Sequence, residues 1–225
     1  WASEIEVMVN PGCRAHFLPC IAGHVGADCA AVILSEAPHL TEALTLIVDV
    51  GTNAEIVLGN RDGLLACSSP TGPAFEGAQV SCGQRAAPGA IERVRIDPET
   101  LEPRFRVIGS ELWSDDPAFD TDTAKTGVTG ICGSGIIEVI GEMFLAGILS
   151  EDGVIDGSKV GLNPRIIPDG RTFSYLLKAG EPEMRITQND IRAIQLAKAA
   201  LYAGARLLMD RLGVDVVDRG VRQPY

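Results

Sequence analysis

The chain has 225 residues, 46% of them hydrophobic, and a formal net charge of −11 at pH 7. This length and apolar content predict one large globular domain or two small lobes around a sizeable core. The acidic balance argues against a nucleic-acid backbone or an anionic membrane as the main partner, because both require basic surface.

The amino-terminal part of the chain has little pattern up to Arg14, and it shows no secretory leader. No apolar run reaches the roughly 20 residues that span a bilayer, so we expect a cytoplasmic protein. A short apolar helix is predicted at Cys29–Leu34. Asp28 stands at its start, where it is either an N-terminal cap or first-turn acid, or a group near a bound nucleotide.

The cysteines are Cys13, Cys20, Cys29, Cys67, Cys82 and Cys132. No C-x-x-C pair occurs among them, which favours buried thiols in a reducing compartment over a disulfide framework. The first three could form a zinc set with His24. Structural zinc ligands usually come in closer pairs, however, and a packed turn is the alternative.

Residues 45–68, TLIVDVGTNAEIVLGNRDGLLACS, predict a three-stranded meander. The expected strands are Thr45–Val50, Ala54–Leu58 and Leu64–Ser68. We expect this meander to belong to a mixed sheet flanked by two long helices.

The first turn of the meander is Gly51-Thr52-Asn53, and it follows Asp49, the only charge of the first strand. Gly51 lets the backbone approach a ligand and adopt a positive φ, while the amides of Thr52 and Asn53 can point at one phosphate. Asp49 could hold Mg²⁺ or its water shell beside that phosphate. The alternative is that D-x-G-T is only a hairpin turn.

A long loop rich in Gly, Ala and Pro follows, SSPTGPAFEGA and onward to Gly89. Ordered loops of this length are often functional. Its main ionisable groups are Glu76 and Arg85. Glu76 could orient water or a metal and Arg85 could meet a phosphate, or both could be structural.

Strands are predicted at Ile91–Asp97 and Phe105–Ile108, and the acidic run at residues 114–122 is expected to be a solvated surface excursion. A second Gly-rich turn, Gly133-Ser134-Gly135, precedes a helix with apolar residues at helical spacing up to Ile148. Such a turn is a ready anion site at a helix N-terminus. Close helix–sheet packing by small residues is an equally good explanation.

Further strands are predicted at Thr172–Leu177, Glu183–Ile186 and Val214–Val217. The longest helix should begin at Thr187 with Asp190 three residues later, in the manner of a capping box. Gly213 is its expected stop.

The ordered motifs VDVGTNAEIVLGN, SSPTGPAFEGA, CGQRAAPGAI, GICGSGIIEVI and ITQNDIRAIQLAKAALYAG resemble the carboxy-terminal domain of the reductive activators of corrinoid proteins. PCIAGHVGAD is similar to the segment that precedes them in that family. The resemblance runs from Pro19 to Asp218, with a weaker stretch between Leu101 and Lys125.

This resemblance implies an α/β fold, a ribonuclease-H-like or actin-like ATPase lobe with a mixed sheet flanked by helices. It implies ATP and Mg²⁺ as ligands and a corrinoid methyl-carrier protein as partner. Members couple ATP hydrolysis to an uphill electron transfer that returns cob(II)alamin to cob(I)alamin. Their [2Fe-2S] cluster lies in a ferredoxin-like domain outside the present chain.

The resemblance also assigns residues. Asp49, Gly51, Thr52 and Asn53 match the family's second phosphate loop, with Asp49 as the metal-organising and catalytic carboxylate. Glu76 lies in the matching G-P-A-F-E-G loop as a second catalytic group. Gly133, Ser134 and Gly135 match the Gly-rich turn, as nucleotide contacts.

Two departures from the family pattern shape the expected domain organisation. The first phosphate loop should lie upstream of Trp1, so residues 1–44 are interpreted as a partial connection from a first lobe. Residues 45–225 are interpreted as the second lobe. This lobe ends before the adenosine loop, because Arg219–Tyr225 stands where the family has a Gly-rich loop of the type L-A-G-A-F-G. We therefore expect little ATP hydrolysis from this chain alone.

Two other functions stay open from the sequence. The chain could be a docking or dimerisation module that binds a corrinoid protein, or a second copy of itself, without ATP turnover. It could also be a small-molecule kinase, because fold alone does not decide function. The sequence offers no convincing substrate-base aspartate for a kinase.

Overall fold

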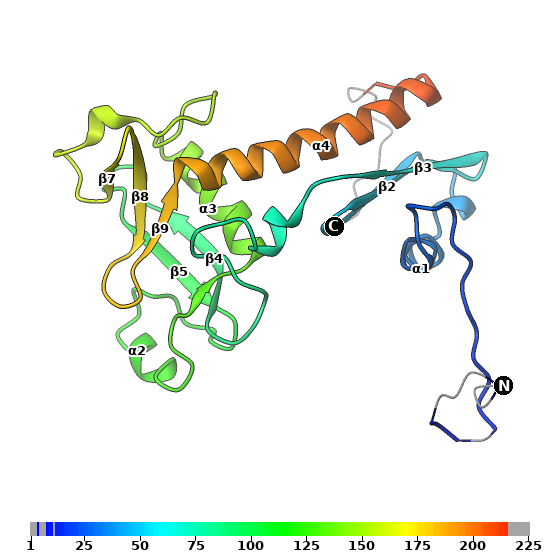
Figure 1. The fold of residues 1–225 in the computed structure, drawn as a ribbon, viewed down its shortest axis with the longest axis horizontal. Helices are drawn as coiled ribbons and strands as arrows, with labels where there is room; N and C mark the ends of the chain where they lie inside the picture. The colour runs from blue at the N-terminus through cyan, green and yellow to red at the C-terminus, as the bar shows by residue number, and fades with distance from the viewer. Residues whose placement is uncertain (1–3, 5–7, 11, 216–225) are drawn as a thin grey trace. The chain divides into compact units, whose positions relative to one another are not determined.

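The computed structural model describes residue 4, residues 8–10 and residues 12–215 (Figure 1). Its helices are α1 (Ala27–Glu36), α2 (Phe119–Asp122), α3 (Gly133–Leu145) and α4 (Gln188–Leu212). Its strands are β1 (Thr45–Val50), β2 (Ala54–Asn60), β3 (Gly63–Ser69), β4 (Ala90–Ile96), β5 (Pro103–Val107), β6 (Gly130–Ile131), β7 (Ile166–Asp169), β8 (Thr172–Lys178) and β9 (Met184–Thr187). Short 3₁₀ helices cover Pro38–Leu40, Pro73–Glu76 and Gly157–Lys159.

The chain divides into two compact units. The first holds the described residues up to Asp49, together with Glu55–Ser68 and those from Gly204 onward, and the second holds Val50–Ala54 and Ser69–Ala203. No helix among the described residues is long and apolar enough to cross a membrane.

The first unit contains α1 and most of the meander, whose strands form a sheet in the order β1-β2-β3. Its small core consists of the buried residues Val25, Cys29, Ile47 and Val57. The predicted meander is confirmed, and its strands lie within two residues of the expected bounds. It forms a separate sheet, however, and is not part of the mixed sheet as we expected, since among the described residues the mixed sheet consists of β5, β4 and β6 alone.

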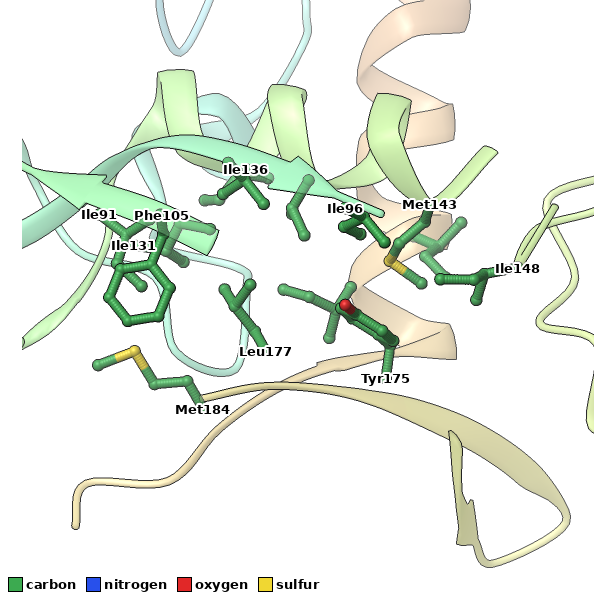
Figure 2. Packing of buried hydrophobic residues seen from close by; sticks show 14 of the residues in the cluster. Ile91, Ile96, Phe105, Ile131, Ile136, Met143, Ile148, Tyr175, Leu177 and Met184 are labelled. Carbon is green, nitrogen blue, oxygen red and sulfur yellow. The ribbon is translucent and has the colours of Figure 1, made fainter. Parts of the chain in front are cut away.

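The second unit contains that mixed sheet. Strand β4 pairs with β5 in antiparallel and with β6 in parallel fashion. A third sheet, β7-β8-β9, is antiparallel throughout. Helix α3 and the strands β4 and β8 contribute to one buried cluster, in which Ile136 and Met143 lie with Tyr175 and Leu177 (Figure 2). Burial of this cluster is the main source of stability in the unit.

Helix α4 begins with a reciprocal cap, as predicted. The backbone N–H of Thr187 donates to Asp190 Oδ2 (2.7 Å), and the N–H of Asp190 donates to Thr187 Oγ1 (3.2 Å). The helix starts in the second unit and ends in the first. Gly213 follows its last residue with φ +68°, and the N–H of Val214 donates to the Met209 carbonyl (3.1 Å), which is the predicted glycine stop.

Several elements differ from the predictions. Part of the acidic run predicted as surface excursion forms the short helix α2, because Phe119 turns inward and is 4% exposed. The strands β6 and β7 were not predicted. Val214 and Asp215 are not in a strand, and the remainder of the strand predicted at Val214–Val217 lies outside the described residues.

Candidate functional site

The Gly51-Thr52-Asn53 bend joins β1 to β2 and belongs to the second unit. The side chains of Thr52 and Asn53 are exposed. Gly51 does not have the positive φ that we expected, but a Cβ at this position would lie 3.1 Å from the Asn53 carbonyl oxygen. Glycine is therefore favoured here by space alone.

Thr71 lies directly behind the bend and is 6% exposed. Its Oγ1 donates to the carbonyl oxygens of Gly51 (2.7 Å) and Thr52 (3.0 Å). A single hydroxyl hydrogen is thus shared between two consecutive carbonyls. Sequence reasoning did not single out Thr71, although its position in the SSPTGPAFEGA loop could have drawn attention to it.

Glu76 lies at the end of the 3₁₀ helix Pro73–Glu76, beside the same bend. Thr52 Oγ1 donates to Glu76 Oε1 (2.5 Å). The loop then turns at Gly77, with φ +82°. The structure therefore brings together two of the residues that the sequence assigned to the site, and it does so across 24 positions of the chain.

Two glycines hold this loop in place by close contact of their backbones. A Cβ on Gly83 would lie 2.0 Å from the Gly77 carbonyl oxygen, and one on Gly77 would lie 2.6 Å from the Gln84 nitrogen. Beyond the crossing, the N–H of Gln84 donates to the Ile131 carbonyl (2.9 Å), which ties the loop to β6. The segment that carries Glu76 is therefore fixed against the mixed sheet.

The N-terminus of α3 packs against the same loop. A Cβ on Gly133 would lie 1.9 Å from the Phe75 carbonyl oxygen, and one on Gly135 would lie 2.3 Å from the Ile91 carbonyl oxygen. Both glycines are thus explained by close packing, one of the two explanations that the sequence left open. Cys132 precedes the helix and does not cap its amides, although its Sγ lies 3.4 Å from Ser134 Oγ in a side-chain hydrogen bond, and Ser134 is exposed. The first-turn amides therefore have no side-chain cap.

A buried carboxylate joins the loop to α4. Asp190 is 2% exposed, and its Oδ1 accepts hydrogen bonds from the N–H (2.9 Å) and the hydroxyl (3.0 Å) of Ser81. Burial and then the charge of Asp190 raise the pKa of the neighbouring Cys82 thiol to about 11. The cap of α4 and the loop after Glu76 are thus one hydrogen-bonded assembly.

Asp49 lies on β1 at a half-buried position and belongs to the first unit. There, burial and then the charges of Glu55, Asp28 and Asp49 raise the pKa of Cys29. The three carboxylates are therefore close enough to one thiol to act on it. Glu55 was missed in the sequence, although it is the only charge in the predicted strand Ala54–Leu58.

No group of three or more His, Cys, Asp or Glu side chains gathers as a metal site in the part of the chain that the structure describes. A cavity of about 490 Å³ lies elsewhere in the second unit, at the ends of β4 and β5. Its arginines are paired with carboxylates, Arg95 with Glu142 and Arg104 with Asp115, both at 3.8 Å. This cavity therefore offers no unpaired positive charge to a phosphate.

A family model described as the C-terminal domain of RACo, the ASKHA domain, matches residues 43–220. The corrinoid activation enzyme RamQ of Eubacterium limosum is 36% identical over 221 residues, which cover 94% of this chain and 34% of that protein. A Co(II) methylated amine-specific corrinoid protein reductase of Methanosarcina barkeri is 28% identical over 214 residues, which cover 92% of this chain and 36% of that protein.

Among solved structures, a reductive activator for corrinoid, iron-sulfur protein matches with a TM-score of 0.78 and 32% identity. The match covers 99% of this chain and 34% of that one. The chain thus spans about a third of the length of the relatives that it matches.

Proposed function

The chain belongs to the family of C-terminal ASKHA domains of RACo, and from this membership we propose that it is the ATP-binding, energy-coupling domain of a corrinoid activator. The predicted family and its actin-like α/β fold are confirmed. The observation that carries the proposal is the match over residues 43–220, together with relatives that are corrinoid activation proteins. The proposed reaction is reduction of a corrinoid protein from the cob(II) to the cob(I) state.

The bend and the α3 N-terminus suit the phosphates of a nucleotide. The backbone of Thr52 and Asn53 is at an exposed turn, and Gly51 leaves room for close approach. The first turn of α3 has no side-chain cap, and helix N-termini favour anions. We propose that these two backbone features bind phosphate, with Ser134 as an additional donor.

The contact between Thr52 and Glu76 suggests how the side chains would act. Because the Thr52 hydroxyl donates its only hydrogen to Glu76, its oxygen lone pairs are left for a cation or a water molecule. The second carboxylate oxygen of Glu76 can accept a hydrogen bond from a water and orient it for attack on a phosphate. Asp49 is proposed as the carboxylate that orients Mg²⁺. Bound Mg²⁺ would neutralise the charge of the phosphate oxygens.

The proposed partner is supported by the relatives, which act on corrinoid proteins according to their names. We propose a corrinoid methyl-carrier protein as partner of the present domain and ATP hydrolysis as its contribution to the uphill reduction. The electrons would come from a [2Fe-2S] cluster held by another part of a longer protein. The free cysteines of the structure are consistent with a reducing, cytoplasmic location.

The test is the ATPase rate of the full-length protein with and without a corrinoid protein in the cob(II) state. We expect the corrinoid protein to accelerate hydrolysis. Asp49→Ala should abolish hydrolysis while circular dichroism shows an intact fold, and Asp62→Ala, an exposed aspartate at the next turn, should leave the rate unchanged.

A rate that does not respond to the corrinoid protein would overturn the energy-coupling role. An unchanged rate in Asp49→Ala would remove Asp49 from the site. Binding of the corrinoid protein without any binding of ATP would favour the docking module instead.

A further inference from the structure

We infer that Thr71 is a positioning residue that turns the backbone amides of Thr52 and Asn53 toward a bound phosphate. The inference rests on the proposed function and deepens it, because it names the residue that gives the bend its anion-binding form. Thr71 itself need not touch the ligand.

Thr71 sets the direction of two carbonyl groups of the bend. Thr71 is only 6% exposed, so water does not compete for its hydroxyl hydrogen. The hydroxyl donates to the carbonyls of Gly51 and Thr52. Both carbonyls therefore point to the same side of the bend, toward the interior of the second unit.

The planar trans peptide then fixes the direction of the two N–H groups. The carbonyl of Gly51 and the N–H of Thr52 belong to one peptide unit and point in opposite directions, as do the carbonyl of Thr52 and the N–H of Asn53. Fixing both carbonyls on Thr71 thus turns both N–H groups to the opposite, solvent side. Two successive amides with a common direction form the concavity that binds an anion.

Thr71 is itself attached to the rest of the site. Its own N–H donates to the Ser69 carbonyl (3.0 Å), and Gly72 next to it has φ +69° before the 3₁₀ helix that ends at Glu76. Thr52 is thus held twice by this short segment, through its carbonyl by Thr71 and through its hydroxyl by Glu76. The direction of the amides and the place of the carboxylate are set together.

The test uses Thr71→Val, which keeps the side-chain shape and removes the hydroxyl, in the full-length protein. Calorimetry with Mg·ATP should give about tenfold weaker binding, the equivalent of one hydrogen bond. Thr71→Ser restores the hydroxyl and should bind within about twofold of the wild type. With Mg·ATP bound, protection from hydrogen–deuterium exchange of the peptide that contains residues 51–53 should be smaller in Thr71→Val than in Thr71→Ser.

The matched control is Thr123→Val. Thr123 is 5% exposed, and its Oγ1 donates to the Phe119 carbonyl (2.8 Å), so the same atoms are removed from an equally buried threonine away from the bend. This variant should lose a similar amount of stability and keep wild-type ATP affinity.

Equal ATP affinity in Thr71→Val and wild type would overturn the inference, and so would equal weakening in Thr71→Val and Thr123→Val. If Thr71→Val does not fold, Thr71→Ala, which removes the same hydroxyl, decides the inference: it should bind Mg·ATP about tenfold more weakly, and wild-type affinity in it would overturn the inference. Failure of the wild type to bind Mg·ATP would instead overturn the proposed function itself, so that the two failures are distinguishable.

Discussion

Replacing Asp190 by alanine tests whether one buried carboxylate holds the start of α4 to the loop after Glu76. Its carboxylate accepts three hydrogen bonds, from the N–H and hydroxyl of Ser81 and from the N–H of Thr187, and it is 2% exposed. The alanine variant removes all three at once. It also removes half of the capping box of the longest helix.

The expected cost can be estimated from these contacts. A hydrogen bond to a charged acceptor contributes about 1.5–3 kcal/mol, and loss of a helix cap costs about 1 kcal/mol. Ser81 is exposed and its donors can turn to water, so the contributions do not simply add. We expect a loss of about 3 kcal/mol in local stability, which is a change of more than about a hundredfold in an opening equilibrium.

The assay is native-state hydrogen exchange of the amides of residues 191–194, whose hydrogen bonds form the first turn of α4. The matched control is Asp97→Ala. Asp97 also accepts three hydrogen bonds, from the N–H groups of Glu99 and Thr100 and from the Thr100 hydroxyl, but in an exposed turn where water can replace it. Exchange at residues 191–194 that is equally slow in both variants would refute the reasoning.

Gly133→Ala should cost about 1–3 kcal/mol in urea unfolding, because its Cβ meets the Phe75 carbonyl, whereas Gly141→Ala on the same helix has open space and should be neutral or slightly stabilising. Burial alone would raise the pKa of Glu138, but hydrogen bonds from the Val94 amide and two arginines lower it below its ordinary 4.5. The stability that the Glu138 carboxylate contributes is therefore complete above pH 4.5 and lost at lower pH. The free energies of unfolding of Glu138→Gln and wild type should differ at neutral pH and converge at low pH. The pKa of Cys82 near 11 predicts slow alkylation at pH 8, and Asp190→Asn should accelerate it; equal rates would contradict a contribution from the Asp190 charge.

Patterns that are local in the sequence were predictable. The alternation of strands and turns marked the meander, and the Thr187–Asp190 spacing marked the cap of α4. The strand β6 was not predictable, because its two residues are defined by pairing with β4 and by the nearby Gly83 bridge, not by a pattern of their own. In β7, two isoleucines before Pro168 are too short a signal for a strand.

In the candidate site, too, local motifs were predictable and long-range contacts were not. Sequence motifs pointed to Thr52 and Glu76 separately, and the structure supplied their hydrogen bond. Thr71 and the link from Ser81 to Asp190 were missed because a threonine in a loop and an acid at a helix start both have ordinary local explanations. The second of these contacts spans 109 positions, which no local pattern encodes.

The most direct test of a phosphate site at the first bend of the meander is the hydrogen-exchange footprint of Mg·ATP on the full-length protein. We expect slower exchange at residues 51–53 and 133–135 when the nucleotide is added, with no change at residues 61–63 in the next turn. Binding of Mg·ATP without protection of residues 51–53 would contradict it.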